Sequence, residues 1–397
     1  MPTIPRKIAP VFAARASRWP IVTLTGPRQS GKTTLCRSQF PEKPYISLEL
    51  PDVRELALAD PRSLLRSLPT GAILDEVQRV PHLLSYLQVD VDERPEPGRW
   101  ILTGSHNLLL MQSVSQTLAG RTALLQLLPL SLEELAHAAL LRGPWYDAAH
   151  QGGWPAPRDR GIPIGEWLAA YIASYAERDV REVLRVSDVA AFQRFLRLCA
   201  GRTGQLLNLA ALAADAGISH NTAAAWISAL ETSYVAVRVQ PWHANLASRE
   251  VKAAKLFFWD TALACALLGI RSPAELALHS ARGQIFENLV AVEALKFDLN
   301  RGDTPGWFHW RDNNGREVDL VRPGSNGGGT AIECKSGETW VSDWNRGLDD
   351  MAKKLLARQQ KLRSAVVYGG EDGRAAAPER GGADLVPWHG VAGWLAG

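Results

Sequence analysis

Short apolar runs alternate with helical stretches through the first third of the chain. Each run is bounded by proline, glycine or charged residues, and four of them are predicted strands: 21–25, 45–50, 72–74 and 100–103. Helical spacing lies between them, for example over 52–59 and 82–89. Strands that alternate with helices predict a parallel sheet, in which ligands bind at the carboxyl ends of the strands.

The rest of the chain follows other patterns. Residues 143–163 are rich in Gly, Pro, Trp and Arg and are predicted to be a linker or loop. From about 164 to 268 the pattern is helical, and from about 281 it indicates a long helix followed by strands near Phe308, Val318 and Ile332. We therefore expect an α/β protein of three parts: a parallel-sheet domain over 1–142, a helical segment over 163–275 and an α/β domain over 276–397.

A glycine-rich loop follows the first predicted strand and precedes a helix. It fits the pattern G-x-x-x-x-G-K-[ST], and with the next residue it comprises Gly26, Pro27, Arg28, Gln29, Ser30, Gly31, Lys32, Thr33 and Thr34. Glycines let backbone N–H groups surround phosphates, Lys32 places a cation on the β- and γ-phosphates, and the Thr33 hydroxyl binds Mg²⁺. The loop therefore predicts a P-loop ATPase domain with ATP and Mg²⁺ as cofactors.

An apolar strand that ends in two acids supplies the second half of such a site. Asp75 is expected to hold Mg²⁺, and Glu76 to polarise the attacking water as a general base. Taken alone, the acidic pair is also compatible with a solvated strand end. Together with the glycine-rich loop it predicts an enzyme, an ATPase.

Two further candidates lie beyond the strand at 100–103. Ser105, with Asn107 as the alternative, is expected to sense the nucleotide beside the γ-phosphate, and a simple turn is the other interpretation. Arg121 is a candidate for contacting the γ-phosphate, either in cis or across a subunit interface. Action across an interface would make a second copy of the chain, in a homo-oligomer, a partner. The alternative for Arg121 is a surface salt bridge.

Helix-turn-helix spacing occupies 209–231. Gly217 suits a left-handed turn, and Ser219 is a good N-cap for the second helix. That helix would expose His220, Asn221 and Thr222 toward DNA, but it carries no Lys or Arg. Basic residues near the two following strands are candidates for a basic wing: Arg238, Arg249, Lys252 and Lys255. Contact with DNA and a structural or oligomer-contact module are the two interpretations.

Three carboxylates and a lysine in the last third of the chain lie at positions whose side chains can meet on one face of the predicted sheet. Glu287 lies in a predicted helix, Asp319 lies on one strand, and Glu333 and Lys335 share a face of the next strand. Carboxylates buried together need a cation, and hard oxygen ligands suit Mg²⁺. Lys335 would orient or activate a water that attacks a phosphodiester. The order resembles the PD-(D/E)xK nuclease fold, although the usual proline before the aspartate is replaced; the alternative is a scaffold kept for binding or for a structural ion-pair network.

The whole chain also resembles a known family. It is similar to the prokaryotic AAA-type ATPases that carry a conserved C-terminal domain of unknown function, in a series of runs that keep their order and spacing: GPRQSGKTTL, AILDEVQ, ILTGSHNLLL, LAGR, YIASYAERDVREV, GQIFENLV and AIECKSGE. The resemblance extends from about 22 to 339. It implies an additional-strand ATPase domain, a winged-helix segment and a nuclease-like C-terminal domain.

Charge and composition limit the partners. The net charge of the 397-residue chain is only +3, so contact with DNA would need local basic patches. Four scattered cysteines without CxxC spacing argue against a zinc site and against a secreted disulfide framework. The N-terminus lacks an apolar signal core, and no apolar run is long enough to span a bilayer. We therefore expect a soluble, cytoplasmic protein without a membrane partner.

Two functions follow from these features. In the first, ATP hydrolysis governs DNA engagement by the winged helix and DNA cleavage by the nuclease-like domain. In the alternative, the chain is a nucleotide-gated signalling or regulatory switch whose C-terminal domain binds a partner without cutting. A DNA-binding transcription regulator is a third interpretation, which the absence of basic residues from the predicted recognition helix disfavours.

Overall fold

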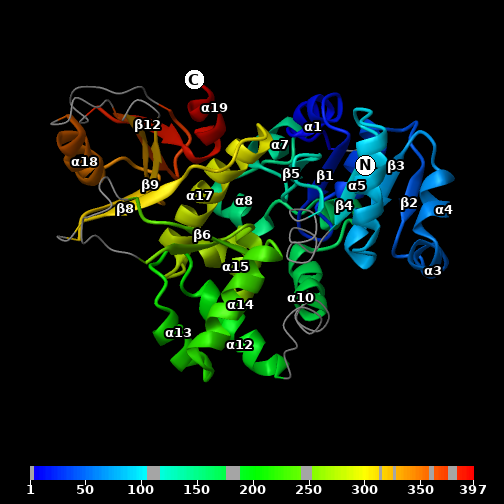
Figure 1. The fold of residues 1–397 in the computed structure, drawn as a ribbon. Coiled ribbons are helices and arrows are strands. Elements are labelled where there is room, and N and C mark those ends of the chain that lie inside the picture. Colours follow the sequence, from blue (N-terminus) through cyan, green and yellow to red (C-terminus); the bar gives the residue numbers. More distant parts are fainter. Residues whose placement is uncertain are drawn as a thin grey trace.

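The computed structural model describes residues 4–104, 117–175, 188–242, 253–312, 315–324, 328–356, 362–373 and 382–397. One sheet lies at the right of Figure 1 and a second at its upper left, and helices of the middle segment project below them. The long helix α17 (Arg282–Asn300) runs through the centre, next to the C-terminal sheet. The expected α/β class is confirmed.

The N-terminal sheet consists of five parallel strands. They are β1 (Ile21–Thr25), β2 (Tyr45–Ser47), β3 (Ala72–Asp75), β4 (Trp100–Gly104) and β5 (Thr122–Gln126), in the order β2-β3-β4-β1-β5. Strand β4 pairs with both β1 and β3, so it separates the strand before the glycine-rich loop from the strand that ends in the acidic pair. The predicted parallel sheet is confirmed, and β4 is the additional strand that the resemblance implied.

Helices cover both faces of this sheet because its strands are apolar on both sides. Successive strand residues point to opposite faces, so Leu74 and Leu102 enter one core while Ile73 and Ile101 enter the other. The helices on the first face are α3 (Pro51–Ala59), α4 (Pro61–Arg66) and α5 (Leu83–Glu93), and those on the second are α1 (Ala9–Ala16) and α2 (Lys32–Gln39). The carboxyl edge of the sheet is left to the loops that form the candidate site.

The segment 143–163 is helical, so the predicted linker is wrong. It forms α8 (Trp145–Gln151) and α9 (Pro155–Arg160), and prolines stand at the start of both helices, where they are tolerated. Trp145 and Trp154 are buried in the large core that the middle segment shares with α17. Burial of these rings, rather than the Gly and Pro content, decides the local structure.

The middle segment contains a three-helix lobe and a hairpin, which are followed by the helices α15 (Thr261–Leu267) and α16 (Pro273–Leu278). The lobe and the hairpin are formed by α12 (Val189–Ala200), α13 (Leu209–Ala216), α14 (His220–Thr232) and the antiparallel strands β6 (Ala236–Val239) and β7 (Lys255–Phe258). Gly217 has a left-handed φ of 71°, and the Ser219 side chain accepts a hydrogen bond of 3.1 Å from the Thr222 N–H. The predicted turn and N-cap are therefore confirmed, whereas a winged helix stays a prediction.

The C-terminal sheet is mixed. Its strands are β8 (Phe308–Arg311), β9 (Glu317–Pro323), β10 (Gly329–Lys335), β11 (Leu362–Tyr368) and β12 (Asp384–Pro387), and β8 to β10 pair antiparallel while β10 to β12 pair parallel. One face packs on α17 and α19 (Val391–Ala396), and α18 (Arg346–Leu356) covers the other. The three predicted strand positions in this part are confirmed.

The hairpin β6–β7 lies against the C-terminal sheet. The Trp242 N–H donates to the His309 carbonyl on β8 (2.7 Å), and the His309 N–H donates to the Gln240 carbonyl (3.0 Å). A single hydrophobic core also joins the middle segment to the α17 face of that sheet. The middle and C-terminal parts are thus packed together. Among the described residues, no helix is long and apolar enough to cross a membrane.

Candidate functional site

The glycine-rich loop joins β1 to the N-terminus of α2. Gly26 has φ +150°, and a side chain there would collide with the Leu127 carbonyl, while Gly31 has φ +94°. Gln29 is left-handed as well, with φ 60°. These conformations explain why glycine is needed at both ends of the loop. They turn the loop around the start of α2, where N–H groups and the helix dipole favour an anion.

Lys32 lies inside this loop. Its ammonium donates to the carbonyls of Gly26 (2.9 Å) and Pro27 (2.8 Å), and the residue is only 6% exposed. Burial lowers the pKa of Lys32 to about 8, although the nearby carboxylates of Glu76 and Asp75 act in the opposite direction. A phosphate placed in the loop would supply the negative charge that this buried ammonium lacks.

Asp75 collects hydrogen bonds from three elements at the carboxyl edge of the sheet. Its Oδ2 accepts from the hydroxyls of Thr33 (2.9 Å) and Tyr45 (2.5 Å), and its Oδ1 accepts from the Thr103 hydroxyl. Thr33 and Asp75, the two predicted Mg²⁺ ligands of the ATP site, are therefore in contact. Their oxygens are of the hard type that Mg²⁺ prefers. Tyr45 and Thr103 were not predicted; both lie on strands that flank β3, and only the sheet order brings them to Asp75.

Glu76 follows Asp75 with unusual backbone geometry. Its φ is 56° and its ψ 44°, which is the left-handed region that a residue with a side chain rarely adopts. The Gln78 side-chain amide donates to its carboxylate. Such local strain is found at functional sites, where the surrounding structure enforces it. This left-handed residue directly follows β3, at the edge of the sheet where the phosphate loop follows β1.

Arg121 lies at the wrong edge of the sheet for a contact in cis. Its carbonyl accepts from the N–H of Ile21 (3.3 Å), the first residue of β1, whereas the phosphate loop follows the last residue of that strand. Its guanidinium instead makes two hydrogen bonds with Asp92, of 2.6 and 2.8 Å. The cis role is therefore wrong, and the surface salt bridge is present. Contact across a subunit interface stays a prediction, and Ser105 and Asn107 lie outside the described residues.

Two side chains of the middle segment reach the phosphate loop. The Trp167 indole on α10 (Ile164–Ser174) donates to the Gln29 side-chain oxygen (3.2 Å). The Tyr234 hydroxyl, just before β6, hydrogen-bonds the hydroxyl of Thr25 at the end of β1 (2.6 Å). Tyr234 is only 4% exposed and has φ 58°. Sequence reasoning missed both contacts, because each joins residues more than 130 positions apart in the chain.

The N-terminal segment adds a third contact with the loop. The Arg6 guanidinium donates to the carbonyls of Ser30 (2.7 Å) and Leu128 (2.6 Å) and pairs with Glu134 (3.0 Å). It therefore ties the loop to the segment that follows β5. No signal in the sequence distinguishes this arginine from the others.

The four predicted residues of the C-terminal cluster lie together. Asp319 accepts from the Cys334 N–H (2.9 Å), and the Lys335 ammonium donates to Glu333 (2.6 Å). Burial, and then the neighbouring Asp319 carboxylate, raises the pKa of both Glu287 and Glu333 well above the ordinary range. Convergence of these side chains is confirmed. In the part of the chain that the structure describes, no group of three or more His, Cys, Asp or Glu is arranged to hold a metal ion, and the metal role of this cluster stays a prediction.

The cluster also contains a lysine that we assigned elsewhere. Lys255 on β7 is 3% exposed, and its ammonium donates to Glu287 (2.7 Å) and Asp319 (3.2 Å). It cannot belong to an exposed basic wing, so that assignment is wrong. Arg238 pairs with Glu231 (2.7 Å) and is not free for phosphate either. The other two wing candidates lie outside the described residues.

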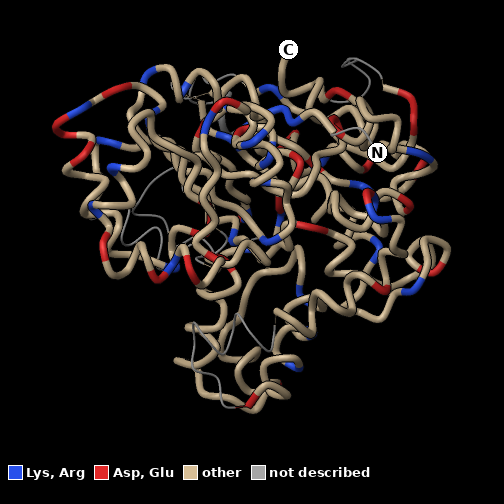
Figure 2. The backbone as a smooth tube through the Cα atoms, turned by 90° about the vertical axis from the view of Figure 1, so that its right-hand side faces the viewer, with Lys and Arg blue, Asp and Glu red and all other residues tan. Residues whose placement is uncertain are grey.

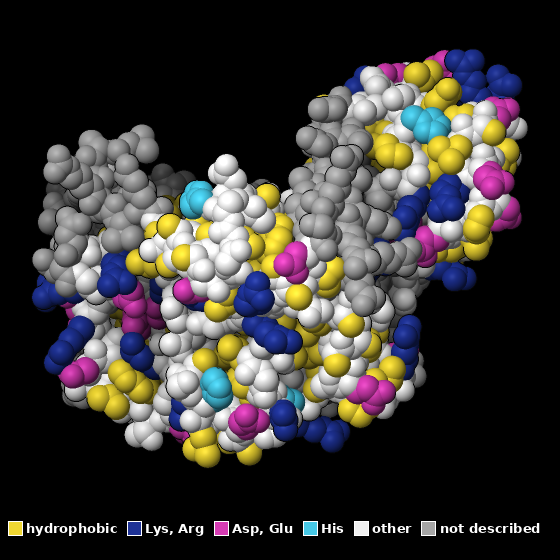
Figure 3. Space-filling model, turned by 90° about the horizontal axis from the view of Figure 1, so that it is seen from below, with side chains coloured by type: hydrophobic (Ala, Val, Ile, Leu, Met, Phe, Trp, Pro, Cys, Tyr) yellow, Lys and Arg dark blue, Asp and Glu magenta, His cyan; other side chains and the backbone are white. Residues whose placement is uncertain are grey.

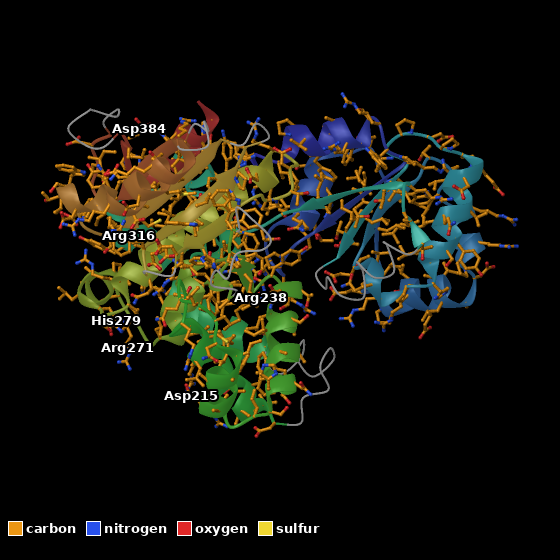
Figure 4. The ribbon with its side chains drawn as sticks, turned by 60° about the vertical axis from the view of Figure 1, so that its left-hand side comes forward. Asp215, Arg238, Arg271, His279, Arg316 and Asp384 are labelled. Atoms are coloured by element: carbon orange, nitrogen blue, oxygen red, sulfur yellow. The ribbon has the colours of Figure 1, made fainter. Side chains whose placement is uncertain are left out.

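The helical lobe offers few free charges at the predicted recognition helix. His220 and Asn221 are exposed, while Thr222 bonds the N-cap Ser219 (2.8 Å). Asp215, which Figure 4 labels at the tip of the lobe, forms an ion pair with Arg202. In Figures 2 and 3 the described part of this lobe carries scattered charges rather than a continuous basic surface.

Three family models match the chain in succession. An AAA domain matches residues 18–136, a domain of unknown function (DUF8612) matches 143–274, and another (DUF4143) matches 282–388. The first match covers the whole N-terminal sheet and its loop. It supports an AAA-type ATPase domain there, whereas the other two descriptions assign no activity.

Two curated proteins and a solved structure are similar to this chain. The uncharacterized protein Rv2008c of Mycobacterium tuberculosis is 31% identical over 357 residues, which cover 89% of this chain and 77% of that protein. The uncharacterized protein Mb2031c of Mycobacterium bovis gives the same values. The Walker-type ATPase paby2304 of Pyrococcus abyssi has a TM-score of 0.43 and 17% identity, and the match covers 66% of this chain and 94% of that one.

Proposed function

This chain belongs to the same family as the two mycobacterial proteins, and we propose that it is a Mg²⁺-dependent ATPase that acts as a nucleotide-gated switch. One observation carries the proposal. The middle segment hydrogen-bonds the strand end before the phosphate loop, through Tyr234 to Thr25, and the loop itself, through Trp167 to Gln29. A change in the loop on ATP binding or hydrolysis would therefore alter contacts of the middle segment directly.

The hydrolytic part rests on four residues of the N-terminal domain. Lys32 binds the β- and γ-phosphates, and Thr33 and Asp75 would hold Mg²⁺, which supplies charge neutralisation for the phosphates when bound. The Asp75 carboxylate accepts from the hydroxyls of Thr33 and Tyr45 in the present structure, and with Mg²⁺ bound the oxygens of Asp75 and Thr33 would serve as ligands of the ion. Glu76 orients the attacking water and accepts its proton.

The switching part uses the hairpin β6–β7 as its output element. Tyr234 lies two residues before β6, so the hydrogen bond between its hydroxyl and that of Thr25 connects the end of β1 directly to the chain that enters the hairpin. Trp167 stacks on Tyr171 with ring centroids 5.1 Å apart, and Tyr171 stacks in turn on Tyr175. Packed rings transmit displacement because interiors are dense. Both routes lead from the loop into the helical lobe.

DNA engagement by that lobe is a second candidate. The helix-turn-helix geometry, with His220 and Asn221 exposed at the start of α14, favours it. The pairing of Arg238 with Glu231 and of Arg202 with Asp215 counts against a strong phosphate contact. We therefore propose first that the lobe and the C-terminal domain bind a protein partner. DNA engagement by the lobe comes second, and cleavage of DNA comes last.

ATP turnover with Mg²⁺, measured with and without DNA, tests these alternatives. Lys32→Ala and Glu76→Gln should each abolish turnover. Arg346→Ala and Asp343→Asn are controls, because these residues form an exposed ion pair in the C-terminal domain and should leave turnover unchanged. Turnover that ignores DNA, together with an ATP-dependent change in elution volume, supports the switch. Turnover raised severalfold by DNA supports the second candidate, and turnover that survives Lys32→Ala contradicts both.

A further inference from the structure

A lysine lies inside the C-terminal carboxylate cluster, which we define as Glu287, Asp319 and Glu333. The Lys255 ammonium donates to Glu287 at 2.7 Å and to Asp319 at 3.2 Å, so it lies between the carboxylates of α17 and β9. Both partners are largely buried, with side chains 14% and 8% exposed. Mg²⁺ would need the same oxygens at about 2.0–2.1 Å. An ammonium in that space excludes a divalent ion by volume and repels it by charge, so the residues present do not fit a metal centre.

The position of Lys255 is fixed by its own backbone. Glu287 is followed by Asn288, whose side chain accepts from the Phe258 N–H (2.8 Å) and donates to the Phe258 carbonyl (2.7 Å). Neighbouring residues of α17 therefore hold both ends of β7. On the other side, Gly204 approaches Glu287 so closely that a side chain there would lie 3.1 Å from its carboxylate. The start and the end of β7 are therefore both held against α17, which keeps the Lys255 ammonium beside Glu287.

Two ammonium groups compensate much of the negative charge of the cluster, to which the neighbouring Glu317 carboxylate also contributes. The three carboxylates face two ammonium groups, Lys255 and Lys335, and each ammonium is within 3.2 Å of its partners. A buried carboxylate group of this kind is costly unless cations and hydrogen bonds compensate it. One oxygen, Oε2 of Glu333, has no hydrogen-bond partner among the described residues. It is a buried carboxylate oxygen that the two ammonium groups leave without a hydrogen bond, and this makes Glu333 the sharpest probe for a bound metal.

We propose that Lys255 is the resident cation of the carboxylate cluster, so that the cluster is an ion-pair network that fastens the hairpin β6–β7 to the C-terminal domain rather than a divalent-metal centre. Lys255 comes from the region matched by one family model and the carboxylates from the region matched by the next. The network therefore ties together two parts that sequence comparison separates. The inference does not depend on ATP hydrolysis.

Mn²⁺ binding to the nucleotide-free full chain tests this proposal. Titrations followed by the electron paramagnetic resonance of free Mn²⁺ would compare wild type, Glu333→Gln, Lys255→Met and the double variant. We expect wild type and Glu333→Gln to bind Mn²⁺ alike, because any binding at Asp75 is common to both. Lys255→Met should gain one site with at least tenfold higher affinity, and the double variant should lose it.

Two outcomes would overturn the proposal. The first is a Mn²⁺ site in wild type that Glu333→Gln removes. The second is a folded Lys255→Met protein that gains no site, because the lysine would then not occupy the place of a cation. If Lys255→Met fails to fold, the unfolding midpoints of wild type and Glu333→Gln, each measured in the presence of EDTA and of Mn²⁺, still test the proposal. Equal midpoints with and without metal support the network, and a midpoint of wild type alone that EDTA lowers refutes it.

Discussion

Removing the hydroxyl of Tyr234 should weaken ATP binding without disturbing the fold. In Tyr234→Phe the ring still fills its buried place, and only the 2.6 Å bond to Thr25 is lost. The Thr25 hydroxyl keeps its bond to the Leu125 carbonyl (3.3 Å), so no donor is left unpaired. The expected cost is therefore about 1 kcal/mol, the net value of one hydrogen bond. If the bond acts on the nucleotide-bound loop, the Kd for ATP rises at most about fivefold.

A double-variant cycle separates this contact from general loosening. Isothermal titration of a non-hydrolysable ATP analogue would compare Tyr234→Phe, Thr25→Val and both together. The two changes should be non-additive by about 1 kcal/mol, because they remove the same bond. Tyr368→Phe is a matched control: it removes a hydroxyl that donates to the Asp372 carbonyl (2.7 Å) in the C-terminal domain. Additivity within about 0.3 kcal/mol, or an equal effect of Tyr368→Phe, would refute the coupling.

Three other predictions follow from the same geometry. The pKa of Lys32 is lowered to about 8, and phosphate favours its ammonium form. ATP affinity should therefore fall as pH rises through 8 and be about tenfold weaker at pH 9 than at pH 7. A flat pH profile in titration calorimetry would contradict this placement of Lys32. Asn288→Leu leaves the Phe258 N–H and carbonyl without their partner and should lower stability by about 3 kcal/mol in urea unfolding, and a change below about 1 kcal/mol would show that the clamp on β7 is dispensable. Arg121→Ala breaks an exposed pair with Asp92 and should leave ATP turnover of the dilute protein unchanged. A loss of turnover that appears only at high protein concentration would support contact across a subunit interface. A loss of turnover at every concentration would contradict the exclusion of a cis role.

The nucleotide site is the part of the fold that the sequence predicts best. The loop needs glycine at two left-handed or crowded positions, and it needs Lys32 and Thr33 next to them. The residues that bind the nucleotide are therefore nearly consecutive in the chain. Asp75 and Glu76 follow a continuous apolar strand, and parallel strands bring their carboxyl ends to one edge. These requirements concern residues that are close in the sequence, so the sequence pattern is sufficient to predict them.

Contacts between distant segments could not be predicted in this way. Lys255 has the sequence neighbourhood of an exposed basic strand, and only the packing of β7 against α17 makes it a buried partner of Glu287. Arg121 was misplaced because the strand at 122–126, whose first residue it directly precedes, was not among the predicted strands. Trp145 lies in a stretch with loop composition, yet its burial turns that stretch into helix. In each case tertiary packing overrides the local signal.

Hydrogen exchange of the full chain, with and without a Mg²⁺-bound ATP analogue, tests the switch most directly. The account predicts altered protection not only in the phosphate loop but also in amides of β6, β7 and the start of α14, and predicts that Tyr234→Phe reduces the distant change while the loop still responds. Altered exchange confined to the N-terminal domain, with β6 and β7 unaffected by nucleotide, would contradict it.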